Sequence, residues 1–273
     1  MPIPPDCTGC SEFNPAVIPH TIVLFVLSPI VLITTIVLLI KSVQRKKLTT
    51  FSLALSFLLF TGVIAIPIVA NVQSFVLGYR PAWVVWTNPS VYFLLCMSIF
   101  FLFIFCAKIF FQDVRRWMIY LYLAWGLLAG TLIILPQNNW GITGASQSFR
   151  LIAQVHLLLY LVVTFSIAIN GAFRTARTIN IPVQKVSLHV IGYGSVILIA
   201  AIACTVIDTL LGLILGPAGT YSFVGTLTWI FAAIGLMCFY IGFIQPSWFK
   251  KRFDKAKSET KRDDQDLNVD DYR

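Results

Sequence analysis

The amino-acid sequence predicts an all-α fold: a polytopic membrane protein built as a seven-transmembrane-helix bundle, with its N-terminus outside and its C-terminus cytoplasmic. Three observations lead to this prediction. Of the 273 residues, 58% are hydrophobic and only 11% are charged, whereas water-soluble domains carry about a quarter charged residues. The apolar residues form runs long enough to cross about 30 Å of hydrocarbon. The basic residues gather in alternate connections between these runs.

Seven segments have the length and composition of membrane spans. One crossing needs a helix of about 20 mostly apolar residues. Barrel strands alternate apolar and polar residues, but runs such as VLITTIVLLI are apolar on every side, so helices are expected. In chain order the predicted spans are 21–40, 51–70, 91–111, 117–135, 151–170, 188–213 and 223–244.

The basic residues predict the orientation, because Lys and Arg are enriched in cytoplasmic loops. The connections after the second, fourth and sixth spans hold only Arg80 and Arg150. The opposite side holds Lys41, Arg45, Lys46, Lys47, Lys108, Arg115, Arg116, Arg174, Arg177, Lys185 and the basic residues of the tail. The net charge of +9 therefore reflects topology and gives no evidence of a nucleic-acid partner.

Three regions follow from this topology. Residues 1–20 are expected to form an extracytoplasmic N-terminal segment, and residues 21–245 the membrane domain in the lipid bilayer. Residues 246–273 form a cytoplasmic tail, first basic and then acidic. The first segment has no basic n-region and the first apolar run has full span length, so a removed signal peptide is not expected. The expected location is a membrane, most simply the cell membrane.

Several function classes are excluded by motifs that are missing. The spans contain no paired carboxylates, no HExxH and no Ser/His/Asp set with plausible spacing, so neither an enzyme nor a cofactor is expected. The sequence contains no Gly-rich phosphate-binding loop, so an ATP-driven pump is not expected. Span 223–244 contains no lysine, which excludes a retinal protein. The third span ends Gln-Asp-Val-Arg-Arg116, which is not the Asp-Arg-Tyr of G-protein-coupled receptors.

The end of the last span reads Gly242-Phe-Ile-Gln-Pro-Ser-Trp-Phe-Lys-Lys-Arg-Phe253. In this segment a helix exits through a proline and an aromatic residue into a basic cluster. In this segment and in its topology, the chain over residues 21–253 resembles the seven-helix sensory modules of prokaryotes. Those modules precede cytoplasmic kinase domains. The resemblance implies a receptor or sensor role. Because the chain ends shortly afterwards, it also implies a separate cytoplasmic or membrane signalling partner.

Two ionisable residues lie within the predicted spans at a depth where a charge costs about 3 kcal/mol. His156 in the fifth span and Asp208 in the sixth both lie about 8–10 Å below the outer boundary. Tyr160 shares the helix face of His156, and Thr205 shares that of Asp208. We therefore predict a ligand-binding pocket lined by His156, Tyr160, Thr205, Asp208 and Trp229. A histidine–aspartate pair in it would respond to an unknown small ligand or to pH.

The same pair has a structural interpretation, in which His156 and Asp208 bond each other or the backbone and only hold the bundle together. A functional pair suits a receptor, our first expectation, or a small proton-coupled transporter or channel. A structural pair suits a non-catalytic subunit of a larger membrane complex.

Two further sets of residues are candidates for function. Arg174 and Arg177 close the fifth span and His189 opens the sixth, where a receptor would couple to its partner or where long side chains reach the inner surface. Cys7 and Cys10 form a CxxC motif in the outer segment. A local disulfide is expected there, and no metal site, because a second pair of ligands is missing.

Overall fold

The computed structural model describes residues 10–15, 17–111, 115–134, 147–215 and 223–251. Helices account for nearly all of this part of the chain, which confirms the predicted all-α class. The long helices are α1 (Val17–Arg45), α2 (Leu48–Leu77), α3 (Thr87–Phe110), α4 (Arg116–Ile134), α5 (Gln147–Thr178), α6 (Pro182–Leu215) and α7 (Phe223–Ile244). Each of these seven contains a segment long and apolar enough to cross a membrane, as expected of a multi-pass membrane protein.

Each helix overlaps one predicted span, and several extend well beyond it. The α1 helix begins at Val17, so His20 lies in its first turns and not in a segment before the helix. The α5 helix continues to Thr178, and α6 begins at Pro182. An apolar run marks only the part of a helix that suits hydrocarbon, whereas internal backbone hydrogen bonds let the helix continue past it.

Short elements connect the helices at one end of the bundle. Strand β1 (Ser11–Glu12) pairs antiparallel with β2 (Tyr79–Arg80), and Ser11 lies opposite Arg80. A 3-10 helix, η1 (Ala82–Trp86), follows β2 and leads directly into α3. The pairing ties the chain before α1 to the connection between α2 and α3, and it positions Arg80.

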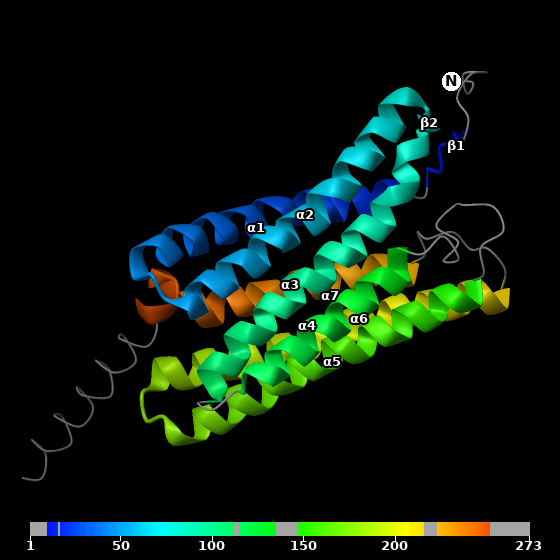
Figure 1. Cartoon of the computed structure of the whole chain (residues 1–273). Helices are drawn as coiled ribbons and strands as arrows, with labels where there is room; N and C mark the ends of the chain where they lie inside the picture. The colour runs from blue at the N-terminus through cyan, green and yellow to red at the C-terminus, as the bar shows by residue number, and fades with distance from the viewer. Residues whose placement is uncertain (1–9, 16, 112–114, 135–146, 216–222, 252–273) are drawn as a thin grey trace, which may run out of the picture.

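The helices lie side by side and alternate in direction (Figure 1). The two strands and the first turns of α3, α5 and α7 lie at one end, which we term the N-terminal end of the bundle. The connections from α1 to α2 and from α5 to α6 lie at the opposite, C-terminal end. Packing is most extensive between α6 and α7, α2 and α3, α5 and α6, and α1 and α2. Contacts of α1 with α7 and of α3 with α5 close the bundle.

Small residues bring α6 and α7 close together. A Cβ atom placed on Gly194 would lie 2.6 Å from Cys238 Cβ, and one placed on Gly235 would lie 2.6 Å from Leu198 Cγ. In lipid, helices gain little by hiding apolar surface, so close packing at small residues is a main source of their association. The two glycines therefore hold α6 and α7 together on one side of the bundle interior.

Polar side chains link the first three helices on the other side. Ser98 Oγ of α3 donates to the Ser56 carbonyl of α2 at 2.9 Å. Asn71 Nδ2 of α2 donates to Thr21 Oγ1 of α1, also at 2.9 Å. Hydrogen bonds between membrane helices contribute about 0.6 kcal/mol each, so these bonds add modestly to the packing of α1, α2 and α3.

Candidate functional site

A cavity lies in the interior of the bundle, lined by every long helix except α4 among the described residues. Arg80 of β2 and Val84 of η1 complete the lining. The cavity has a volume of about 150 Å³, which is room for on the order of ten water molecules. Along α3 the lining runs from Thr87 to Leu102, a rise of about 22 Å. The cavity thus extends from the N-terminal end past the middle of the bundle.

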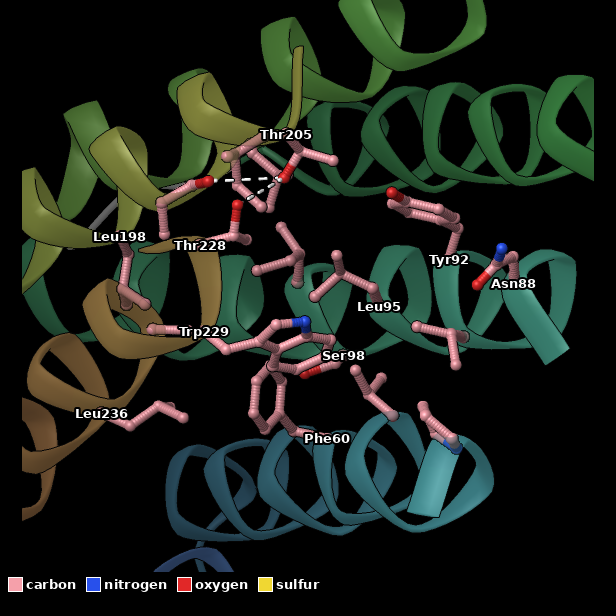
Figure 2. Close-up of a pocket in the computed structure, with 18 of the residues that line it drawn as sticks. Phe60, Asn88, Tyr92, Leu95, Ser98, Leu198, Thr205, Thr228, Trp229 and Leu236 are labelled. Carbon is pink, nitrogen blue, oxygen red and sulfur yellow. Dashed lines mark hydrogen bonds between the residues drawn. The ribbon is translucent and has the colours of Figure 1, made fainter. Parts of the chain in front are cut away.

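Polar side chains surround the part of the cavity nearest the N-terminal end, and mainly apolar side chains line the remainder, where Ser56 and Ser98 hydrogen-bond each other. The first group, the polar rim, consists of His20, Asn71, Arg80, Thr87, Asn88, Tyr92, Thr205, Asp208 and Thr228. The second group, the apolar floor, consists of Phe57, Leu102, Phe165, Leu198, Leu236 and Phe239. In Figure 2, Tyr92 and Leu95 of α3 point with Trp229 of α7 into the same space. Such a gradient is typical of sites that bind a small molecule in one orientation.

Arg80 supplies the positive charge of the polar rim. Its Nη2 donates to the Val84 carbonyl at a long 3.4 Å. Its Nε is buried and has no hydrogen-bond partner in the described part of the chain. The same is true of the Thr87 hydroxyl, and Thr87 is only 6% exposed. Two groups with unused hydrogen-bonding capacity therefore belong to the same rim.

Asp208 of α6 supplies a carboxylate to the rim and has an interaction partner of its own. One turn earlier, Thr205 shares a hydrogen bond of 3.4 Å with Thr228 of α7, drawn as a dashed line in Figure 2. Trp229 of α7 meets the imidazole of His20 edge to face, with ring centroids 5.4 Å apart. These contacts place side chains of α1, α6 and α7 around one part of the cavity.

Of the residues predicted to bind a ligand, Thr205, Asp208 and Trp229 line this cavity. His156 and Tyr160 are not part of its lining. His156 Nε2 instead accepts a hydrogen bond of 2.9 Å from Trp125 Nε1 of α4. The sequence prediction is corrected on this point, because the bond of His156 goes to α4 and not to Asp208.

The rotation of α5 explains the correction. Leu161 and Phe165 of this helix face the cavity. Tyr160 precedes Leu161 by one residue, and successive side chains of a helix are turned by about 100°. The Tyr160 ring therefore packs on α4, where it stacks on Tyr122 with centroids 4.3 Å apart. Apolar residues cover several faces of α5, so the sequence pattern does not reveal which face meets the cavity.

His20, Arg80, Thr87 and Asn88 line the cavity although the sequence pattern does not predict them as site residues. His20 precedes the first predicted span and Arg80 lies in a predicted connection, so neither is an ionisable group within a predicted span. One signal was available: Arg80 and Arg150 are the basic residues on a side of the predicted topology that is otherwise without them. The position of Arg80 on the rim depends on the pairing of β1 with β2, which joins residues far apart in the sequence.

The predicted coupling residues lie at the C-terminal end of the bundle, away from the polar rim. Arg174 and Arg177 are exposed. The half-buried His189 packs near Phe173, with ring centroids 5.7 Å apart. Their role in coupling stays a prediction.

The N-terminal cysteines are described only in part. Cys10 takes part in a disulfide bond, whereas Cys7 lies outside the described residues. Cys96, Cys106, Cys204 and Cys238 are free thiols. In the described part of the chain, no group of three or more His, Cys, Asp or Glu side chains could hold a metal ion.

Comparison with known proteins adds no family to these observations. No protein-family model, curated protein or solved structure matches the chain. The functional proposal is based on the cavity and on the distribution of charge.

Gln154 of α5 gives a first testable prediction. It is 2% exposed, and neither atom of its amide group has a hydrogen-bond partner among the described residues. A buried polar group without a partner costs about 1–3 kcal/mol. We expect Gln154→Leu, which keeps the approximate shape, to raise the unfolding temperature in detergent by about 2–8 °C.

The matched control for this prediction is Gln184→Leu, because Gln184 is exposed. It should leave the unfolding temperature nearly unchanged. A lower unfolding temperature for Gln154→Leu would show that the amide is bonded, for example to an ordered water, and would contradict the prediction.

Proposed function

We propose that this chain is an integral membrane receptor that binds a small, mainly apolar ligand in its cavity and signals to a separate partner. The observation that carries the proposal is the gradient of the cavity, from the polar rim to the apolar floor. Both charged groups of the lining, Arg80 and Asp208, belong to the rim. A site of this kind favours a molecule with one polar end and an apolar body.

The charges at the two ends of the bundle support an orientation with the cavity toward the outside. The C-terminal end carries Lys41, Arg45, Lys46, Lys47, Lys108, Arg115, Arg116, Arg174, Arg177, Lys185, Lys250 and Lys251. Basic residues prefer the cytoplasmic side of a membrane. With that end in the cytoplasm, a ligand enters the rim from outside, and the partner meets the bundle at Arg174, Arg177 and His189.

The path from ligand to partner would follow α6 and α7. These helices line the cavity with Thr205, Asp208 and Trp229. They remain packed on each other deeper in the bundle, through Gly194 and Gly235. The helices α6 and α7 could pack against α1–α3 in more than one arrangement. A ligand that binds more tightly to one of these arrangements shifts the population toward it.

Aromatic packing within the apolar floor, and between α3 and α7, favours a receptor over an open channel. The rings of Phe165 and Phe239 meet at 6.4 Å, and those of Phe105 and Phe243 at 4.7 Å. A transporter that uses the same cavity would have to separate these rings in each cycle. Transport of a solute or proton across the membrane therefore distinguishes a transporter from a receptor.

The test uses purified protein in lipid nanodiscs and N-phenyl-1-naphthylamine, a neutral apolar dye that fluoresces when it leaves water. Ala201 lines the cavity and is 1% exposed, whereas its neighbour Ala200 is exposed. We expect Ala201→Phe to fill the cavity and weaken dye binding at least about tenfold, the effect of some 1.4 kcal/mol. The matched variant Ala200→Phe should bind the dye like the unmodified chain, with empty nanodiscs as the background.

Equal dye binding by the Ala201→Phe and Ala200→Phe variants would rule out the cavity as the site. Proton flux into liposomes that contain the protein, reported by a trapped pH-sensitive dye and absent from empty liposomes, would favour the transporter instead. Co-purification of a stoichiometric membrane partner without dye binding would favour the subunit.

A further inference from the structure

Arg80 of the polar rim, close to η1 in the chain, has unused hydrogen-bonding capacity. Arg80 makes one long hydrogen bond to a backbone carbonyl and keeps its buried Nε without a partner among the described residues. A guanidinium has five N–H donors in a planar fork that matches a carboxylate. Arg80 is half-buried, and leaving its buried Nε donor without a partner is costly. The free donor at Arg80 therefore favours an anionic group in the cavity.

The Thr87 hydroxyl is a second polar group of the rim with unused hydrogen-bonding capacity. Thr87 is 6% exposed, it lines the cavity, and its hydroxyl has no hydrogen-bond partner in the described residues. Thr87 begins α3 directly after η1. Val84, whose carbonyl accepts the hydrogen bond from Arg80, lies within η1. A hydroxyl and a guanidinium on one side of a cavity can both donate to the same oxyanion.

Below these two groups, α3 presents mainly apolar side chains to the cavity, with Tyr92 and Ser98 among them. Val91, Leu95, Ile99 and Leu102 line it in turn, and all four are buried. The distance along α3 from Thr87 to Leu95 is about 12 Å at 1.5 Å per residue. That is close to the length of an extended eight-carbon chain. The accessible space, about 150 Å³, suits a ligand of on the order of ten heavy atoms.

We infer that the ligand is a monocarboxylate with a medium-length apolar chain, a class that includes the medium-chain fatty acids. Its carboxylate accepts hydrogen bonds from Arg80 and Thr87, and its chain lies along α3 toward the apolar floor. This inference rests on the proposed function and names the class of ligand for the same cavity.

Asp208 decides between a carboxylate and more highly charged anions. It lines the same cavity from α6 and carries a negative charge when ionised. One arginine balances one negative charge, whereas a phosphate monoester carries close to two at neutral pH. The carboxylate of Asp208 in the same lining makes a doubly charged ligand less favourable. A cationic ligand is disfavoured by the positive charge of the Arg80 guanidinium, whose Nε has no partner among the described residues.

The experiment measures displacement of N-phenyl-1-naphthylamine from the nanodisc protein at neutral pH by octanoate, octanol, octylamine and octyl phosphate. These share one chain and differ in the polar group. We expect octanoate to bind about ten- to a hundredfold more tightly than octanol, as hydrogen bonds to a charged group allow. Arg80→Gln and Thr87→Val should each reduce this preference, and Arg116→Gln, a change of an exposed arginine at the opposite end of the bundle, should not.

Thr87→Val protects the test from a folding defect, because it removes a hydroxyl that has no hydrogen bond to lose. An octanoate affinity no higher than that of octanol overturns the inference, as does tighter binding of octylamine or octyl phosphate. A preference that survives both Arg80→Gln and Thr87→Val overturns it too. In these cases octanol still displaces the dye, so the cavity remains a binding site. Failure of the dye itself to bind removes the proposed function as well.

Discussion

Gly194→Ala is expected to lower the free energy of unfolding by about 1–3 kcal/mol, as insertion of a methyl group into a well-packed core does. The added Cβ would lie 2.6 Å from Cys238 Cβ and 3.1 Å from the Gly235 carbonyl oxygen of α7. Neither atom can turn away, because one belongs to the backbone and the other is attached to it. The expected fall in unfolding temperature is about 3–10 °C, measured by thermal unfolding in detergent.

Gly192→Ala is the matched control, two residues away on the same helix. Its Cβ would meet the tip of the Phe173 ring, 2.8 Å from Cζ, which a small change in the χ1 angle of Phe173 relieves because this atom is the far end of a flexible side chain. Alanine is better than glycine in a helix by about 0.5–1 kcal/mol, so this variant should be as stable as the unmodified chain or slightly more. Equal losses for both variants would show that α6 tolerates no added methyl group anywhere, and that the contact of α6 with α7 is not special.

The difference between these glycines is not visible in the sequence. Gly192 and Gly194 lie in the same apolar run, and only the packing of α6 on α7 gives them different neighbours. By contrast, the seven helices could be predicted, because length and apolar composition are properties of a continuous segment. The sequence therefore predicts which residues are helical with more success than it predicts what each face of a helix touches.

The candidate site illustrates the same limit. Thr205 and Asp208, one turn apart on α6, could be grouped from their spacing, and Trp229 from its depth in α7. His156 was grouped with them from its depth, and Tyr160 from sharing the helix face of His156. The rotation of α5 directs these two residues to Trp125 and Tyr122 of α4 instead. Arg80 and Thr87 join the site through the β1–β2 pairing and η1, and neither element leaves a periodic pattern in the sequence.

Tyr122→Ala is the second substitution with a large expected effect. Tyr122 is 5% exposed, and its ring lies between Phe103, at a centroid distance of 3.9 Å, and Tyr160, at 4.3 Å. Its hydroxyl donates to the Tyr160 carbonyl at 2.7 Å and bonds the Thr164 hydroxyl. Loss of a buried aromatic ring costs about 3–5 kcal/mol. Tyr122→Phe keeps the ring and removes only the hydrogen bonds, so it should cost about 1 kcal/mol.

The Tyr122 variants also test whether the α4 contact is separate from the cavity. No described residue of α4 lines the cavity, so Tyr122→Ala should lower the unfolding temperature but leave dye affinity unchanged below that temperature. His156→Ala, which removes the acceptor for Trp125, should behave in the same way with a smaller loss of stability. Ala201→Phe should instead weaken dye binding without disturbing the packing of α4 on α5, because it fills the cavity and touches no residue of the α4 contact named above. If Tyr122→Ala or His156→Ala weakens dye binding as strongly as Ala201→Phe, then the aromatic contact of α4 with α5 belongs to the binding site, and the assignment of His156 and Tyr160 to packing is wrong.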